Sequence, residues 1–572
     1  MVELVRGKRR LAALTLSALV AHAASGQTAT TPGAISAPFP TTVGIALEWG
    51  ISGDSNNNGV VDIRYRVQGS SGWALGLPLT RVPAGSNGAF SWASRHSGSL
   101  FDLASGTEYE IELSLSDPDG GNAVQVINVA TASVPEPAPN SIVRLVTPAN
   151  LASMLASVNP GEILDLQPGD YPGFTLDRDG LPGAPVVLRG QTGVQINGEL
   201  RMFFRQDVIL DSLTVNGRIR FNGSNRISIQ RCRVNASADQ FNGDGIVSFL
   251  RSESAYIVDN TVVGTTPWVE SALGASGANR GEGIVVTGPG HVIAHNRVSG
   301  FRDNISLMED GSAVDQFSID IYANELSEAA DDAIEADFCF HNCRIWQNRV
   351  SNAFIAFSSQ PSLGGPTYFV RNAAYNVAHV AFKLYRESVG DVLLHNTVVK
   401  AGDGLGLYPS VPVRRTFARN NLTIGGPGGT LNGFSNGSGR VIQFADLQAS
   451  GASLDYNAYG STVGSFEGQV GAISFSTLAQ LRALTTEIHA VEVDMGGFAQ
   501  AISMPNDPMV MHTAKDLRLA ASATAIDAGI VLPGINHGYS GANPDAGAYE
   551  RGQPLPEYGP RTTPALFADG FE

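Results

Sequence analysis

Four carboxylates fall within seven residues of the chain, in the segment DDAIEAD at residues 331–337. They are Asp331, Asp332, Glu335 and Asp337, and Ala and Ile occupy alternate positions as they would in a strand. Such charges repel one another and destabilise a fold unless something neutralises them. Ca²⁺ takes about six to eight oxygen ligands of this kind. The segment therefore predicts a calcium site, the alternative being carboxylates that only solubilise an exposed face.

Two further residues belong to this prediction. Asp303 stands one repeat before the acidic segment and is a further candidate ligand. Lys383, in AFKLY, stands alone on an otherwise neutral segment and is a candidate Brønsted base. Aligned on apolar positions, Glu335 and Lys383 share one column, two strands or about 9–10 Å apart. Only Ala356 is expected between them, which predicts a groove with small walls.

The elements that position these residues are short strands in a repeat. Seven asparagines align in one column, and the last four intervals between them are each 24 residues. A fixed period of this size with strand-like alternation is typical of a solenoid, here a right-handed parallel β-helix. Stacked inward asparagines would hydrogen-bond between coils, so we interpret them as structural. The column comprises Asn260, Asn296, Asn324, Asn348, Asn372, Asn396 and Asn420.

The second strand of each repeat carries the candidate chemistry. Side chains alternate between the two faces of a strand. If Ile334, Ala336, Phe382 and Leu384 face the interior, the alternate residues must face outward together. Those residues are Glu335, Asp337, Lys383 and Tyr385.

The rest of the chain divides into an N-terminal module and terminal segments. Residues 1–26 have a basic start, a short apolar run and small residues, which predicts a secretory signal peptide. Residues 35–134 resemble a fibronectin type III domain, with Trp49 on an early strand and LASGTEY as a tyrosine corner. Residues 135–141 form a Pro-rich linker, and 142–551 form the β-helix with a C-terminal capping segment. Residues 552–572 are a Pro-rich tail predicted to be disordered until its last residues, FADGFE.

Composition excludes several classes of partner. The formal net charge of −16 argues against nucleic acid and anionic membranes. No apolar run is long enough to span a bilayer. Three cysteines do not make a disulfide scaffold; Cys339 and Cys343 either close a small loop or remain reduced, and reduced buried thiols are favoured. We expect a secreted or periplasmic bacterial protein, all-β and monomeric.

The acidic segment and the lysine together resemble the pectate lyases of polysaccharide lyase family 9. These are right-handed parallel β-helices with an Asp on one coil, a D-D-x-x-D calcium set on the next and an F-K-L lysine base. The resemblance places Asp331, Asp332 and Glu335 on the calcium set and Lys383 on the base. Glu335 replaces an aspartate, and Asp303 lies in a coil of different length. Tyr385 and Arg386 stand where the family has glycines.

The resemblance implies β-elimination on an acidic polysaccharide. Removal of the C5 proton of a uronate needs a neutralised carboxylate, which Ca²⁺ provides, and a neutral Lys383, whose pKa a nearby cation would lower. Arg386 would hold a substrate carboxylate, the alternative being a surface ion pair with Glu387 or Asp391. Tyr385 and Tyr408 would stack on sugar rings.

Two other functions remain open. DDAIEA also resembles the DDCIAI pair of polygalacturonases, which are inverting hydrolases on the same fold. That family carries a G-H-G strand one coil later, where this chain has NAFIAF. The second alternative is a non-catalytic protein that uses the face of the solenoid to bind glycans.

Overall fold

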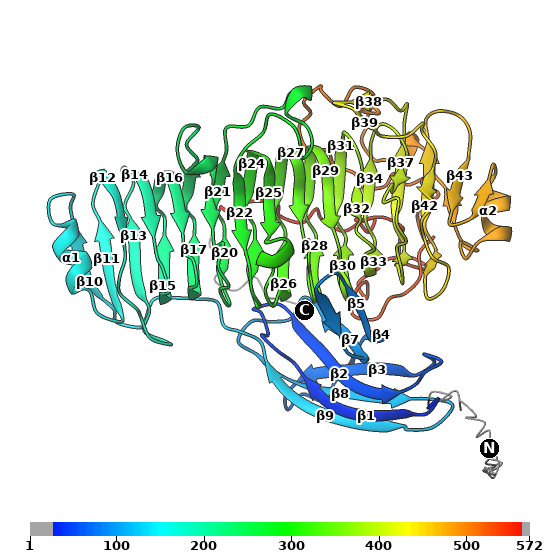
Figure 1. Ribbon diagram of the computed structural model, residues 1–572, viewed down its shortest axis with the longest axis horizontal. Coiled ribbons are helices and arrows are strands. Elements are labelled where there is room, and N and C mark those ends of the chain that lie inside the picture. Colours follow the sequence, from blue (N-terminus) through cyan, green and yellow to red (C-terminus); the bar gives the residue numbers. More distant parts are fainter. Residues whose placement is uncertain (1–26, 563–572) are drawn as a thin grey trace, which may run out of the picture.

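A computed structural model describes residues 27–562 (Figure 1). The predicted signal peptide at 1–26 and the FADGFE end lie outside the described residues. The described chain is all-β, as predicted, and α1 (Leu151–Ser157) and α2 (Leu478–Leu484) are its two α-helices. No helix within residues 27–562 combines the length and apolarity that crossing a membrane requires.

The N-terminal module is a seven-stranded antiparallel sheet in the order β1-β2-β7-β4-β3-β8-β9. Trp49 is fully buried in its core, and the Tyr109 hydroxyl accepts a 2.9 Å hydrogen bond from the Ala104 amide, as a tyrosine corner would. The strands are β1 (Thr30–Ser36), β2 (Ile45–Gly53), β3 (Val60–Val67), β4 (Ala74–Val82), β7 (Arg95–Leu100), β8 (Glu108–Ser116) and β9 (Ala123–Ala130).

From residue 142 the chain alternates between two long parallel sheets. The first has 13 strands and the second 17, each ordered along the chain. The first sheet comprises β10 (Ile142–Val146), β11 (Glu162–Leu166), β13 (Val186–Gly190), β15 (Gln206–Asp211), β17 (Asn225–Gln230), β20 (Tyr256–Val258), β23 (Val292–Ala294), β26 (Phe317–Tyr322), β28 (His341–Trp346), β30 (Leu363–Val370), β33 (Val389–Leu394), β36 (Phe417–Arg419) and β41 (Ser453–Asp455).

The second sheet runs beside the first along the whole coil (Figure 1). It comprises β12 (Gly169–Thr175), β14 (Val194–Arg201), β16 (Thr214–Arg220), β18 (Arg233–Asn235), β19 (Ile246–Val247), β21 (Thr261–Val263), β22 (Glu282–Val286), β24 (Arg297–Phe301), β25 (Asp303–Leu307), β27 (Glu325–Glu335), β29 (Arg349–Ser359), β31 (Ala373–Val377), β32 (Phe382–Leu384), β34 (Thr397–Val399), β37 (Leu422–Gly425), β42 (Ala458–Ser461) and β45 (Val491–Glu492).

One apolar core runs between the parallel sheets, from Val146 to Ala490. Parallel sheets joined by such alternation are compatible with a β-helix.

Short elements lie beside the long sheets. The short strands are β5 (Gly85–Asn87), β6 (Phe90–Trp92), β35 (Leu405–Gly406), β38 (Thr430–Leu431), β39 (Phe434–Ser435), β40 (Ile442–Phe444), β43 (Gly468–Val470) and β44 (Ile473–Phe475). The 3₁₀ turns are η1 (Phe241–Gly243), η2 (Glu270–Ala272), η3 (Asp310–Ser312) and η4 (Met495–Gly497).

The asparagine column is a buried hydrogen-bonded ladder. The Asn324 side-chain amide donates to Asn348 Oδ1 at 2.9 Å, and the next coils repeat this contact. The last predicted member was wrong, because Asn421 and not Asn420 accepts from Asn396. The residue before each ladder position has a positive φ, for example +54° at His395, and Asn420 takes that place with +59°. Asparagine tolerates this conformation, so Asn420 can stand directly before the ladder residue Asn421, and the sequence alignment selected the wrong one of the two.

The C-terminal segment runs back along the solenoid. Residues 530–562 contact progressively earlier coils, from Asn420 at Ile530 to Ala323 at Gly559. At its end Arg561 forms a 2.6 Å ion pair with Asp259. The predicted disorder is therefore wrong for residues 552–562. The Pro-rich composition of the segment indicated disorder, whereas these contacts and the buried Tyr558 hold its backbone against the solenoid.

The N-terminal sheet is joined to the 13-stranded sheet by buried polar contacts. Arg344 is fully buried, with its guanidinium 2.7 Å from Asp320 and 3.1 Å from the Ser99 hydroxyl. Thr41 donates a further hydrogen bond to Asp320. A buried guanidinium needs such partners on every side, so these contacts fix how the two sheets lie against each other.

Candidate functional site

Two paired strands of the 17-stranded sheet bring an acidic cluster together. Asp303 opens β25, and Asp332 and Glu335 lie on β27, which pairs with β25. Each of these three residues is at most 5% exposed. One carboxylate oxygen from each lies within 4.8 Å of the others. We call these three residues the acidic triad.

Lys383 on β32 faces the acidic triad. Its ammonium lies 2.5 Å from Asp332 Oδ2 and 3.6 Å from Glu335 Oε1. The flanking Phe382 and Leu384 belong to the interior core, as do Ile334 and Ala336. The alternation predicted for these two strands is therefore confirmed. The acidic and basic side chains share the outer face.

Glu335 and Lys383 lie in one column, but the residue between them is Ser358 and not Ala356. The predicted alignment matched Ile334 with Ile355. In the structure Phe357 pairs with Ile334 and fills the core, whereas Ile355 packs in an outer apolar cluster. A bulge between Ala329 and Asp332 shifts the register here.

The other two predicted carboxylates have separate surroundings. Asp331 lies beside Arg302, whose guanidinium approaches it to 3.8 Å and approaches Asp303 to 3.3 Å. Asp337 accepts hydrogen bonds from the Ser358 hydroxyl and from the Gln360 amide at 2.8 Å. It groups with Glu309 and Glu335 in a second set of oxygens within 4.8 Å. The five predicted acids therefore form one cluster with two centres.

Burial perturbs the ionisation of these carboxyls. Burial first, and then the charges of neighbouring acids, hold the pKa values of Asp303 and Glu335 well above their ordinary range. Burial likewise raises the pKa of Asp331 to about 7 and that of Asp337 to about 8. Near neutral pH the chain alone therefore holds several of these groups protonated.

The residues fit a divalent cation. Within residues 27–562, six carboxyls lie beside the cationic side chains of Arg302 and Lys383. The oxygens Asp332 Oδ1 and Asp337 Oδ2 are buried and have no hydrogen-bond partner among the described residues. Unpartnered buried carboxylate oxygens are costly, and a hard cation would satisfy them. The six carboxyls are Glu282, Asp303, Asp331, Asp332, Glu335 and Asp337.

The carboxylates also determine the charge of Lys383. Burial alone would lower the pKa of its ammonium, but the charges of Asp332, Asp337 and Glu335 outweigh burial and hold it well above its ordinary value. This direction is opposite to the lowering expected beside a bound cation. With the chain's own residues alone, Lys383 is the counter-ion of the acidic triad rather than a neutral base.

Arg386 is bound by residues that the sequence did not indicate. Its guanidinium lies 2.8 Å from Asp310 and 3.9 Å from Glu309, not beside Glu387 or Asp391. Glu387 pairs with Arg414 instead, and buried Asp391 accepts from Ser359. Both partners of that alternative were therefore wrong, because the fold brings the η3 turn of an earlier coil closer to Arg386 than Glu387 or Asp391.

The two predicted stacking tyrosines are partly buried. The Tyr408 hydroxyl donates a 2.6 Å hydrogen bond to Asp403. Burial raises the pKa of Tyr385 to about 12, although the nearby Lys383 charge opposes this. Tyr385 thus lies near the lysine, and Tyr408 is held by a carboxylate outside the acidic triad.

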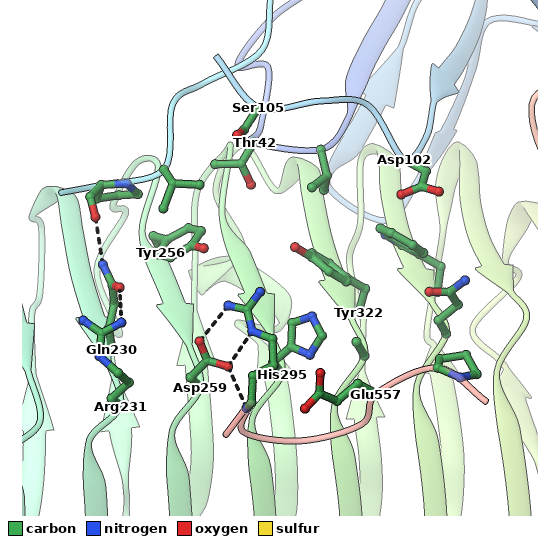
Figure 2. A pocket seen from close by; sticks show the side chains of 18 of the residues that line it. Thr42, Asp102, Ser105, Gln230, Arg231, Tyr256, Asp259, His295, Tyr322 and Glu557 are labelled. Atoms are coloured by element: carbon green, nitrogen blue, oxygen red, sulfur yellow. Dashed lines mark hydrogen bonds and ion pairs between the residues drawn. The ribbon is translucent and has the colours of Figure 1, made fainter. Parts of the chain in front are cut away.

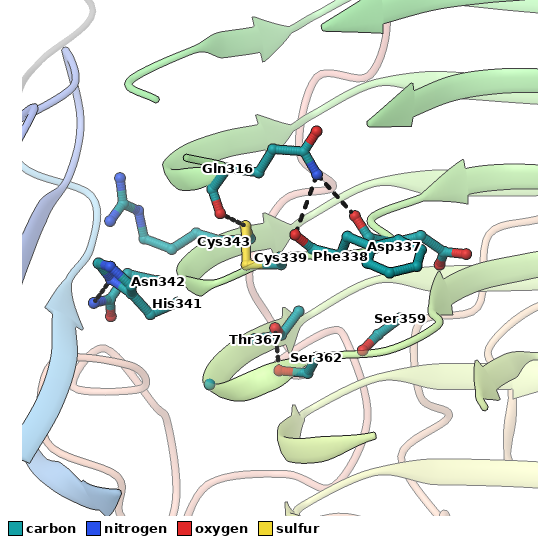
Figure 3. Close-up of a disulfide and its surroundings, with 12 residues drawn as sticks. Gln316, Asp337, Phe338, Cys339, His341, Asn342, Cys343, Ser359, Ser362 and Thr367 are labelled. Atoms are coloured by element: carbon teal, nitrogen blue, oxygen red, sulfur yellow. Dashed lines mark hydrogen bonds between the residues drawn. A yellow bond between two sulfur atoms is a disulfide. The ribbon is translucent and has the colours of Figure 1, made fainter. Parts of the chain in front are cut away.

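The turn that follows the acidic strand is fixed by a disulfide. Cys339 and Cys343 are bonded, with Cα atoms 6.3 Å apart, so the favoured alternative of two reduced thiols was wrong. Figure 3 shows the Gln316 amide donating to the carbonyls of Asp337 and Phe338 beside this bond. These contacts hold the backbone of Asp337, and hence its carboxylate, in place.

The sequence interpretation missed Glu282 and Arg302. Glu282 pairs with Asp303 in the strand register, and burial raises its pKa to about 7. A signal was present, since the second residue of each aligned segment is acidic in four successive coils. That column contains Asp244, Glu282, Asp303 and Asp332. Arg302 gave no signal apart from its position next to Asp303.

The acidic triad is covered by neighbouring segments. Lys383 is only 7% exposed. The connection from β25 to β26, residues 308–316, carries the η3 turn, which Arg386 holds through Asp310. One carboxylate oxygen of Glu309, in this connection, lies within 4.8 Å of oxygens of Glu335 and Asp337, so the connection borders the cluster.

Comparison with known protein families gives no match for this chain, and no curated protein matches it.

Proposed function

We propose that this protein is a secreted, Ca²⁺-dependent polysaccharide lyase that cleaves a uronate-containing glycan by β-elimination. Its scaffold would be a right-handed parallel β-helix preceded by a fibronectin type III-like sandwich. The observation that carries the proposal is the acidic triad with the Lys383 ammonium 2.5 Å from Asp332. An oxygen nest beside an amine on one face is the arrangement that elimination next to a carboxylate needs.

Asp303, Asp332 and Glu335 would hold the cation, with Asp337 and Asp331 beside them. When bound, the cation supplies positive charge that neutralises a uronate carboxylate and acidifies the adjacent carbon. Lys383 Nζ would then accept the C5 proton. The electron pair of that C–H bond forms the C4–C5 double bond, the C4–O4 bond breaks, and the leaving oxygen takes a proton from water.

The other predicted residues would bind substrate. Arg386 is 45% exposed at its side chain and would exchange Asp310 for a substrate carboxylate. Tyr385, next to Lys383, would contact a sugar ring. This exchange would also release the connection at residues 308–316, which links substrate binding to access.

The test is a screen of acidic polymers: polygalacturonate, alginate, heparin and chondroitin sulfate, with CaCl₂ or with EDTA. We expect an ultraviolet-absorbing unsaturated end to appear with one of them, with CaCl₂ only, and to be absent with Lys383→Ala. Reducing ends without unsaturation would indicate a hydrolase and overturn the proposal. So would activity that persists in Lys383→Ala.

A non-catalytic glycan-binding protein is the second candidate. The observation that favours it is the ion pair of Lys383, whose pKa the carboxylates raise although elimination needs a neutral amine. For this candidate, glycan binding would persist in Lys383→Ala and in EDTA, and no unsaturated product would form.

A further inference from the structure

A large cleft of the described chain lies on the other parallel sheet, away from the acidic triad. It has a volume of about 1050 Å³, at the upper end of the range of about 300–1000 Å³ typical of ligand pockets. Its floor extends across the 13-stranded sheet from Ile209 to Gln347. Six parallel strands span about 24 Å at their usual spacing, so the cleft is elongated.

Three separate segments close this cleft. Its upper wall comes from the N-terminal module, with Thr42 and Ser105, and from the linker at residues 134–137. Its other wall is the returning C-terminal segment, which carries Glu557 and Arg561 (Figure 2). The cleft exists only because these distant segments meet over one sheet.

Aromatic rings line the floor. Tyr322 stacks on Trp346 with ring centroids 4.4 Å apart. Tyr256 stands two strands before Tyr322, and the strand between them contributes only the small Val292 and Ala294 to this cluster. Figure 2 shows the hydroxyls of Tyr256 and Tyr322 directed toward the space between the two rings. Trp346 covers one face of Tyr322, the His295 ring lies edge-on to it with centroids 5.6 Å apart, and Tyr256 is only 7% exposed. The two hydroxyl groups, and not open ring faces, therefore line this space.

The polar groups of the cleft suit a ligand with many hydroxyls. The side chain of Gln347 lines the cleft, and His295 Nδ1 has no hydrogen-bond partner among the described residues. The Glu557 carboxylate lies on the opposite wall. Amide and imidazole groups donate to and accept from hydroxyl groups, and a carboxylate accepts from them.

The charges exclude an acidic ligand. Both guanidinium groups are already paired, Arg561 with Asp259 at 2.6 Å and Arg231 with Asp211 at 2.9 Å. The lining carboxylates outnumber them, so an anion would be repelled. The charged residues of the lining are Asp102, Glu136, Asp211, Asp259, Glu557, Arg231 and Arg561.

We propose that this cleft binds a neutral oligosaccharide, at a site distinct from the acidic triad. Its hydroxyls bond to the hydroxyl groups of Tyr256 and Tyr322 and to Gln347 and Glu557. The site does not depend on the proposed lyase activity. It would attach the protein to a neutral glycan while the other sheet faces a different polymer.

The test is isothermal titration of the full mature chain with neutral pentasaccharides of cellulose, xylan, mannan and starch. We expect at least one to bind. Ser105→Trp fills the cleft from its upper wall and should abolish binding, whereas Ser71→Trp, on an exposed turn outside the cleft, should not change it. Tyr322→Phe keeps the stacked ring and should weaken binding about 3- to 10-fold, the value of one neutral hydrogen bond.

The outcomes separate this site from the lyase proposal. Binding should be unchanged in Lys383→Ala and in EDTA. Failure of all four neutral pentasaccharides to bind at millimolar concentration would overturn the inference, and so would binding unaffected by Ser105→Trp. Tighter binding of glucosamine or galacturonate oligomers than of the neutral sugars would also overturn it, because the site would then select charge.

Discussion

Replacing Lys383 by methionine tests whether the acidic triad is a cation site. Only 8% of the Lys383 side chain and none of the Asp332 side chain is exposed. Removing one partner of such a buried pair leaves an uncompensated charge and costs about 3–5 kcal/mol. In EDTA at pH 8, we therefore expect Lys383→Met to lower the free energy of unfolding by about this amount.

Calcium should reverse this loss. The Lys383 ammonium occupies Asp332 Oδ2 at 2.5 Å, so it competes with a cation for the same oxygen. Without this competitor the variant should bind Ca²⁺ more tightly than the wild type. A cation at about 100 times its Kd adds about 2.7 kcal/mol to stability. The variant should thus gain more stability from CaCl₂ than the wild type, while its lyase activity is lost.

The assay is denaturant unfolding of both proteins in EDTA and in a CaCl₂ series, with Lys515→Met as the matched control. Lys515 lies 5.7 Å from the ring of Tyr375, outside the cluster. Its replacement should cost less than about 1 kcal/mol and leave the calcium response unchanged. If Lys383→Met gains no more from CaCl₂ than the wild type, the ammonium and a cation do not share Asp332, and the calcium argument fails.

Three further predictions concern the same region and the ladder beneath it. In EDTA, the free energy of unfolding should fall as pH rises from 5 to 8. The folded-state pKa values are about 7 for Asp331 and about 8 for Asp337; both exceed the unfolded values, so the folded state binds more protons. A melting temperature that does not change with pH would contradict this. Arg386→Ala should speed proteolysis within residues 308–316, since it removes the 2.8 Å contact with Asp310; an unchanged cleavage rate would show that this ion pair does not hold the connection. Asn348→Ala should lower the free energy of unfolding by on the order of 3 kcal/mol, because buried amides and carbonyls of two coils lose their hydrogen-bond partners. A loss below about 1 kcal/mol in urea unfolding would show that the asparagine ladder does not stabilise the fold.

Local patterns predicted the repeat because each coil must satisfy the same conditions. The alternation around Ile334 and Phe382 was predictable, since a strand with one buried face has a period of two. The asparagine ladder was predictable because buried turn backbone needs a partner on every coil. Glu335 and Lys383 could be placed in one column for the same reason.

Sequence alone therefore determined the all-β class, the repeat, and the outer face that carries the acids and the lysine. Only the tertiary structure decided which side chains touch. The register shift after Ala329 pairs Ser358 with Glu335, the η3 turn forms an ion pair with Arg386, and the neighbouring carboxylates keep Lys383 a charged counter-ion. The cleft over the 13-stranded sheet also has no local signal, since its walls come from segments hundreds of residues apart. The period of a strand determines which face a side chain is on. The distances between side chains and their charge states depend on how successive coils stack, and no short segment of sequence contains that information.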